Sequence, residues 1–100
     1  MPKVANNTYM ETADNGDISF RLHSTDVVVR HADGSATLNS GGWRTVTTKE
    51  RLNRYAPCRV YQEKFAWYVV GKDATGAWDW AHPAPFEDGM RVDARGRVIA

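Results

Sequence analysis

The groups that could bind a ligand are densest between residues 39 and 54 of this 100-residue chain. A glycine turn in this segment leads toward a predicted helix. Such a turn can present backbone N–H groups to an anion beside the positive end of the helix dipole. The sequence therefore predicts an anion site whose members are Gly41, Gly42, Arg44, Thr45, Lys49 and Arg51.

The same segment also has an explanation that needs no ligand. The glycines could make a tight turn, Trp43 could anchor the hydrophobic core, and the threonines could cap the helix. The spacing matches neither a Walker A loop nor a GxGxxG fingerprint, so it does not specify a nucleotide. Both interpretations stay open on the sequence.

Positive charge is concentrated in and after this segment. The whole chain carries a formal net charge of +1, whereas residues 44–64 hold six basic and two acidic residues, a local charge of +4. Basic groups interleaved with aromatic ones are typical of nucleic-acid surfaces, where cations neutralise phosphates and rings stack on bases. The alternative is a solvated helix face with a Glu50–Arg54 pair at favourable spacing.

A second candidate site is aromatic. Trp78 and Trp80 alternate with an acid in a loop-rich region, so both could face one side and form a stacking platform for a planar or cationic ligand. Packing in the core would explain the same tryptophans.

The histidines and the cysteine form no recognisable catalytic or metal pattern. The three histidines stand apart and there is one cysteine, so we expect no metal site and no cofactor. His23-Ser24-Thr25-Asp26 holds the residue types of a hydrolytic triad, but triad members normally meet from separate elements, which favours a polar turn. Cys58 could be activated by Arg59 or could be a buried thiol.

Hydrophobic alternation, β-branched residues and turn dipeptides predict an antiparallel β-meander with hairpins. We place strands at about 17–22, 26–31, 35–39, 59–62 and 66–70, with one last hairpin within 86–99. One short α-helix is predicted over about 47–55, packed on the sheet. Thr47 would cap it in a capping box with Glu50, and Leu52, Tyr55 and Thr48 would share its inner face. The fold class is therefore α+β.

Length and composition predict one domain over residues 1–100, with a mobile polar leader at 1–16. The single cysteine, the absence of a long apolar run and the polar N-terminus indicate a cytosolic protein that is not bound to a membrane.

Residues 37–53, TLNSGGWRTVTTKERLN, together with segments near residues 22–28 and 60–69, resemble a family of short proteins encoded by bacteriophages and prophages. The resemblance spans about residues 20–70 and carries over no activity and no functional residue. It implies a small phage protein in the cytoplasm of a bacterial host. By analogy, such proteins often act by binding, including the blocking of host defences.

Three hypotheses follow. The first is a non-enzymatic phage protein that holds nucleic acid or a nucleotide at the 39–54 loop and helix start. The second is an inhibitor of a host or bacterial-defence protein, resembling an anti-CRISPR or another anti-defence protein, that acts through a protein–protein interface. The third, ranked lowest, is a hydrolase using His23 or Asp26.

Overall fold

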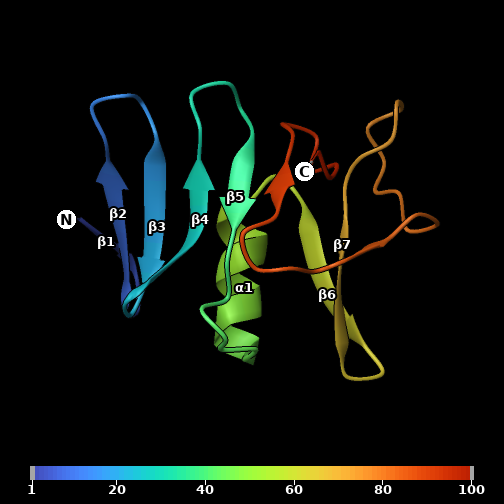
Figure 1. Cartoon of the computed structure of the whole chain (residues 1–100), viewed down its shortest axis with the longest axis horizontal. Coiled ribbons are helices and arrows are strands. Elements are labelled where there is room, and N and C mark those ends of the chain that lie inside the picture. The colour runs from blue at the N-terminus through green and yellow to red at the C-terminus, as the bar shows by residue number, and fades with distance from the viewer. Residues whose placement is uncertain (1, 100) are drawn as a thin grey trace.

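The computed structural model describes residues 2–99 and consists of two antiparallel sheets and one helix (Figure 1). The larger sheet has the order β1-β2-β3-β4-β5-β9. Its strands are β1 (Lys3–Ala5), β2 (Thr8–Thr12), β3 (Ile18–Leu22), β4 (Thr25–Arg30), β5 (Ala36–Leu38) and β9 (Arg91–Val92). Five of the six strands follow the chain as a meander, which confirms the α+β class and its predicted hairpins.

The smaller sheet has the order β6-β7-β8, with strands β6 (Arg59–Glu63), β7 (Ala66–Val70) and β8 (Ala84–Pro85). The helix α1 (Val46–Tyr55) connects the two sheets and contacts β3, β4 and β6. In Figure 1 the helix lies behind β5, and the β6–β7 hairpin extends to its right. Pro85 lies on the edge strand β8, which has no neighbouring strand on its outer side to accept a hydrogen bond from the N–H that proline lacks.

One hydrophobic core joins these layers. Leu52 of α1 is fully buried, and Tyr55 stacks on Phe20 of β3 with ring centroids 4.2 Å apart. From the smaller sheet, Val60 and Trp67 face the same interior. The predicted inner face of the helix is therefore confirmed for Leu52, Tyr55 and the buried Thr48.

The N-cap of the helix lies two residues before the predicted one. Thr45, not Thr47, is the N-cap, and its hydroxyl accepts a hydrogen bond from the backbone N–H of Thr48 at 3.1 Å. The Thr47 side chain is exposed, and Glu50 instead pairs with Arg54 at 2.6 Å. The predicted capping box is therefore wrong, because a threonine two residues upstream has the extended backbone that a cap requires.

Trp43 does not anchor the core. Its side chain is 68% exposed, and Val46 at the start of the helix is 79% exposed. The interpretation in which Trp43 anchors the core is therefore wrong, because Leu52, Thr48 and Arg51 fill the face of the helix that packs on the sheet.

Residues 1–16 were expected to form a leader, but they hold two strands. Each residue of β2 pairs with β3, from Thr8 opposite Leu22 to Thr12 opposite Ile18. Asn15-Gly16 lies in the turn that closes this hairpin, with Gly16 at φ +92°. The polar composition of residues 1–16 does not predict these strands, because β2 is stabilised by its hydrogen bonds to β3 and by the buried Thr8 rather than by an apolar run. Residues 1 and 100 lie outside the described part.

The described chain has a radius of gyration of 12.9 Å. Within residues 2–99, no helix is long and apolar enough to cross a membrane.

Candidate ligand-binding groove

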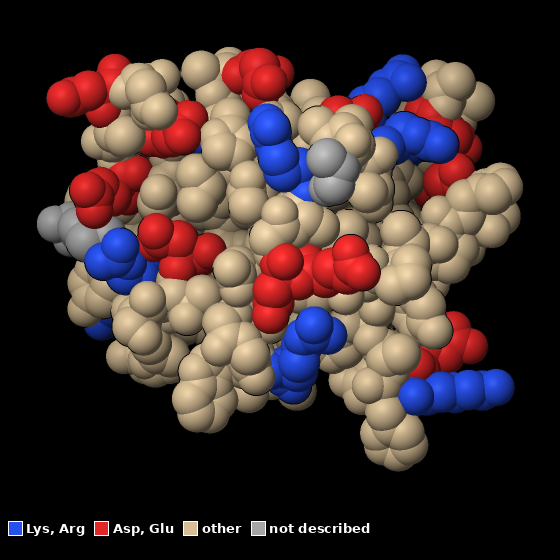
Figure 2. All heavy atoms as spheres, in the orientation of Figure 1, with Lys and Arg blue, Asp and Glu red and all other residues tan. Residues whose placement is uncertain are grey.

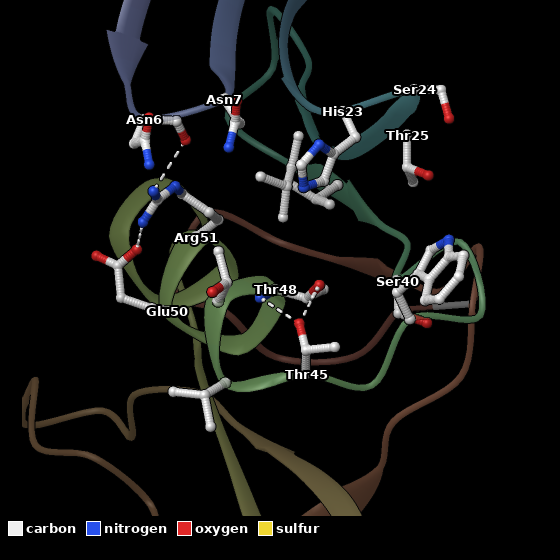
Figure 3. Close-up of a pocket in the computed structure, with 15 residues that line it drawn as sticks. Asn6, Asn7, His23, Ser24, Thr25, Ser40, Thr45, Thr48, Glu50 and Arg51 are labelled. Atoms are coloured by element: carbon white, nitrogen blue, oxygen red, sulfur yellow. Dashed lines mark hydrogen bonds and ion pairs between the residues drawn. The ribbon is translucent and has the colours of Figure 1, made fainter.

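A groove of about 520 Å³ opens between the first turns of α1 and the strand ends that face them (Figure 3). One wall is the helix start, and the opposite wall is built from the β1–β2 and β3–β4 turns. The lining residues are Asn6, Asn7, Leu22, His23, Ser24, Thr25, Val27, Ser40, Trp43, Thr45, Val46, Thr47, Thr48, Glu50 and Arg51. Most of these residues are neutral and polar, and the charged pair Glu50 and Arg51 neutralises itself.

The glycine loop borders this groove, but its N–H groups are used within the chain. Gly41 N–H donates to Asn39 Oδ1 at 2.7 Å, and Gly42 N–H donates to Ser40 Oγ at 3.2 Å. Trp43 N–H donates to the Ser40 carbonyl at 3.0 Å. The loop therefore presents no row of free donors at Gly41 and Gly42, in contrast to the anion cradle suggested by the sequence.

Both glycines are required by the fold. Gly41 has φ +63°, and a Cβ on it would lie 2.3 Å from Thr25 Oγ1. Gly42 has φ +84° in open space, so only its backbone conformation disfavours a side chain. The turn is thus pressed against β4, which fixes the distance between the loop and the β3–β4 turn.

Ser40 and Asp88 hold the other side of the loop. The buried Ser40 donates from its N–H and its hydroxyl to Asp88 Oδ1, at 2.8 and 2.7 Å. Partial desolvation opposes the charge on Asp88. The hydrogen bonds from Ser40, the nearby Arg44 and the Gly42 N–H outweigh that effect and lower the pKa of the carboxyl. The loop is therefore tied to the segment between β8 and β9 through an ionised carboxylate.

Arg44 and Lys49 are brought together over Trp67. The guanidinium carbon of Arg44 lies 5.2 Å from the Trp67 ring centroid and 4.8 Å from that of Phe86, while Lys49 Nζ lies 5.8 Å from the Trp67 centroid. Arg44 Nε also donates to Ser40 Oγ at 3.2 Å. Both cations thus lie on aromatic rings and neither lines the groove.

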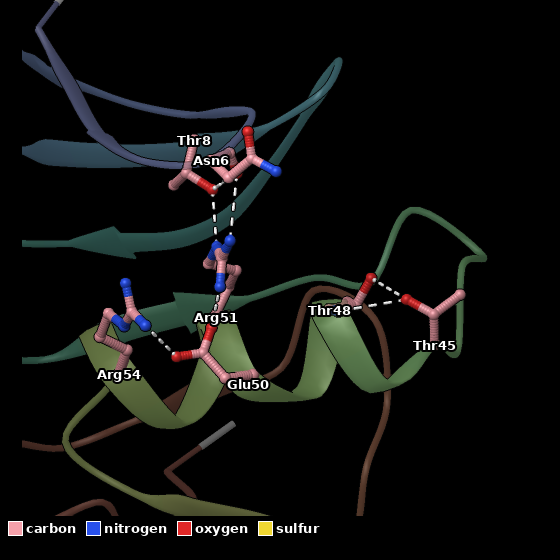
Figure 4. A network of polar contacts seen from close by, with 7 residues as sticks. All are labelled: Asn6, Thr8, Thr45, Thr48, Glu50, Arg51 and Arg54. Atoms are coloured by element: carbon pink, nitrogen blue, oxygen red, sulfur yellow. Dashed lines mark hydrogen bonds and ion pairs between the residues drawn. The ribbon is translucent and has the colours of Figure 1, made fainter.

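Arg51 instead points from α1 toward Asn6 and Thr8 of the N-terminal strands (Figure 4). Its Nε donates to the Thr8 hydroxyl at 2.7 Å, and its Nη2 donates to the Asn6 carbonyl at 3.1 Å. Nη1 pairs with Glu50. With a relative exposure of 9%, Arg51 joins the helix to the N-terminal strands, and each of its three guanidinium nitrogens has a partner within the chain.

The groups left for a ligand are at the helix start. Thr45 accepts from Thr48 N–H and, through its carbonyl, from Lys49 N–H at 3.0 Å. The N–H groups of Val46 and Thr47 precede the first intrahelical bond and have no helical partner. No acidic residue lies in the first turn, so the positive end of the helix dipole is not compensated there.

The surface charge offers no broad basic field on the face shown in Figure 2, where acidic and basic side chains are interspersed. The basic residues that give residues 44–64 their local charge of +4 lie on different sides of the structure. Arg51 points inward, Arg54 pairs with Glu50, and Arg59 lies over Trp78 with its guanidinium carbon 5.6 Å from the ring centroid.

The residue types of a triad do not assemble. His23 lies at the β3–β4 turn with φ +56°, and in Figure 3 its ring projects toward α1. Asp26 instead pairs with Arg21 at 2.9 Å. Burial raises the pKa of the Cys58 thiol to about 12, so at neutral pH it stays protonated. Within residues 2–99, no group of three or more His, Cys, Asp or Glu side chains could hold a metal ion.

Trp78 and Trp80 lie in the 71–83 segment between β7 and β8, and neither lines the groove. Trp78 is half-buried, and Trp80 is 56% exposed. Trp80 meets the edge of Tyr61 with centroids 5.6 Å apart, so the sequence prediction missed the tyrosine that accompanies it.

Asn6 and Asn7 were also missed as groove residues. Their signal was the Asn-Asn dipeptide, a turn signal that the leader assignment left unused.

No curated protein and no solved structure matches the chain. A match to a protein family, in contrast, covers residues 3–93 and so extends well beyond the 20–70 stretch that carries the phage resemblance. On that match, the chain belongs to the Kyanoviridae Gp96 protein family, a family of phage proteins.

Proposed function

We propose that this phage protein is a non-enzymatic binding protein that holds a nucleotide, free or at the end of a nucleic-acid strand, in the groove beside α1. The observation that carries the proposal is the groove itself. Its volume of about 520 Å³ is within the range of small-molecule sites, and it combines an exposed tryptophan with hydroxyl and amide side chains.

The exposed indole of Trp43 supports the placement of a base. A tryptophan that is 68% exposed contributes little to the core, whereas a planar ligand stacked on it would cover apolar surface. Ser24, Asn6 and Asn7 line the opposite wall, where their hydroxyl and amide groups can bond the polar edge of a base or a sugar.

The helix start supports the placement of a phosphate. Val46 and Thr47 supply N–H groups without helical partners, and the Thr47 hydroxyl lines the same groove. Because Glu50 is paired with Arg51 and Arg54, the lining holds no free carboxylate that would repel the ligand.

Amide chemical-shift mapping tests the proposal on the whole chain. Mononucleotides titrated at low salt should shift the resonances of Asn7, Ser24, Val46 and Thr47 together. Trp43→Ala should weaken the binding, whereas Trp80→Ala, which removes an exposed tryptophan from the segment between β7 and β8, should leave it unchanged.

Two results would contradict the proposal. One is the absence of shifts in the groove with every common ribonucleotide and deoxyribonucleotide. The other is binding that Trp80→Ala weakens as much as Trp43→Ala does. Inorganic phosphate alone serves as a separate probe, since it should shift Val46 and Thr47 but not Ser24.

A second candidate function, inhibition of a host or bacterial-defence protein, is favoured by the tip of the β6–β7 hairpin. Phe65 is 96% exposed there, and it and Lys64 have φ values of +68° and +50°. A left-handed backbone conformation is energetically costly for residues other than glycine, so the stability of the turn does not explain why Lys64 and Phe65 are found there. A protruding aromatic side chain is instead typical of an anchor in a protein interface.

This second function predicts a stoichiometric protein partner in nuclease-treated host lysate. Phe65→Ala should abolish capture of that partner, and Trp43→Ala should leave it intact. Capture that is insensitive to Phe65→Ala would reject the hairpin tip as the anchor.

A further inference from the structure

The outer face of the smaller sheet carries a surface that is separate from the groove. Tyr61 and Tyr68 lie directly opposite each other on β6 and β7, with ring centroids 5.6 Å apart. The alternate residues Val60 and Trp67 face the core, so the two tyrosines face outward. We name Tyr61, Tyr68, Trp78 and Trp80 the aromatic face.

The two tryptophans come from the 71–83 segment between β7 and β8 and extend this face. Trp80 meets the edge of the Tyr61 ring at 5.6 Å, and Trp78 is bridged to Lys72 directly after β7. Tyr61, Tyr68 and Trp78 are each half-buried and Trp80 is 56% exposed. The solvent side of an antiparallel sheet normally carries polar residues, whereas this side carries two tyrosines, with Trp80 of the segment after β7 packed on one of them.

Two cations flank the aromatic face. The guanidinium carbon of Arg59 lies 5.6 Å from the Trp78 ring centroid, and Lys72 Nζ lies 5.1 Å from it. Both side chains are exposed, and within residues 2–99 neither forms an ion pair. Of the acids nearby, Asp79 is paired with Arg97 and His82.

We propose that the aromatic face, with Arg59 and Lys72, binds single-stranded nucleic acid. Cations without ion-pair partners beside partly exposed rings complement a polyanion that carries planar groups, and a single strand supplies both. A duplex keeps its bases stacked inside, so it could use the cations but not the rings. Glu63 lies on the same side of the sheet at the hairpin end. Because its carboxylate repels phosphates, the phosphates of a bound strand should lie toward Arg59 and Lys72.

Fluorescence anisotropy with labelled oligothymidylate and oligouridylate tests the proposal. Trp80→Ala should weaken binding about tenfold to a hundredfold, because one stacked base is lost. The double variant Arg59→Ser/Lys72→Ser should weaken binding and lower the slope of log affinity against log salt by about 1.4, corresponding to two phosphates on a single strand. These side chains are exposed, so the variants should fold, which circular dichroism checks.

Controls separate this surface from the groove. Arg30→Ser removes an exposed cation of the larger sheet and should leave oligonucleotide affinity unchanged. Trp80→Ala should in turn leave mononucleotide binding unchanged. Failure at one surface is therefore distinguishable from failure at the other.

Three results would overturn the proposal. They are no oligonucleotide binding at low salt, equal affinity for a duplex of the same length, and equal losses from Arg30→Ser and the Arg59/Lys72 double variant. Loss of a protein partner by Trp80→Ala, with oligonucleotide affinity unchanged, would instead make the aromatic face a protein interface.

Discussion

Arg51 on the helix donates from Nε to the hydroxyl of Thr8 on β2, at 2.7 Å and across 43 residues of sequence. Both side chains are buried, and the same guanidinium reaches the Asn6 carbonyl. This contact joins the N-terminal strands to the wall of the groove formed by α1, because Asn6 and Arg51 both line it. The N-terminal segment is therefore part of the candidate site rather than an appendage to it.

Arg51→Ala is expected to lower the free energy of unfolding by about 3 kcal/mol, since it leaves the buried Thr8 hydroxyl without its donor and removes a buried charged partner. Urea unfolding followed by fluorescence measures this loss. Arg54→Ala is the matched control, because Arg54 is exposed and pairs with the same Glu50. Its loss should be much smaller, and equal losses from the two variants would show that the Thr8 contact contributes nothing.

Thr45→Ala is expected to destabilise the protein by about 1 kcal/mol, because the Thr48 N–H would lose its capping acceptor. Thr47→Ala, two residues away and exposed, should change stability by less than about 0.5 kcal/mol. Thermal unfolding of the two variants measures the difference. A larger loss from Thr47→Ala would restore the capping box predicted from the sequence.

Local pattern was sufficient for most of the larger sheet. The alternation in Ile18–Leu22 and the β-branched run before Arg30 predicted strands within one or two residues of their observed ends. The same signals were sufficient for β6 and β7. These segments bury their own apolar side chains, so the information lies within each segment.

Long-range partners decided what local pattern could not. β2 depends on the β3 ladder and on Arg51, and nothing within Thr8–Thr12 reveals either. The cap was misplaced because three threonines compete within one turn, and the choice depends on how Ser40 and Asp88 hold the preceding loop.

The residues of the predicted anion site are separated in the structure, again because their partners are far away in sequence. Arg44 and Lys49 lie over Trp67, which the chain reaches only in the next hairpin, while Arg51 points toward the N-terminal strands. These three residues are close in sequence, but their spacing does not determine which of them a ligand can reach. The groove is formed by turns far apart in sequence, so no single segment predicted it.

Replacing Lys64-Phe65 with Asn-Gly is expected to stabilise the protein by about 1 kcal/mol, because both positions have positive φ and Asn-Gly is preferred in such two-residue turns. The midpoint of thermal unfolding should rise by about 4–8 °C. Phe65→Ala is the control: it removes the exposed ring but keeps the strained backbone, so it should leave the midpoint nearly unchanged. A fall in the midpoint for Asn-Gly would show that the turn is not strained.

Asp88→Asn is expected to change how stability depends on acid. Because hydrogen bonds from Ser40 and the nearby Arg44 outweigh partial desolvation and lower the Asp88 pKa in the folded state, the carboxylate stabilises the fold at pH values above its unfolded pKa of about 3.9. This contribution is lost as the pH falls toward the lower folded pKa. The gap in stability between wild type and Asp88→Asn should therefore be constant from neutral pH to about pH 5 and shrink below about pH 4.

Urea unfolding midpoints across this pH range measure the effect of Asp88. Asp14→Asn makes the same change in net charge at an exposed residue that, within residues 2–99, forms no hydrogen bond or ion pair through its side chain. Its curve should run parallel to that of wild type. If the Asp88→Asn curve is also parallel, the carboxylate does not hold the Ser40 loop. If the gap closes in acid, the 39–44 loop that borders the groove is held by this carboxylate, and its anchoring weakens as Asp88 is protonated.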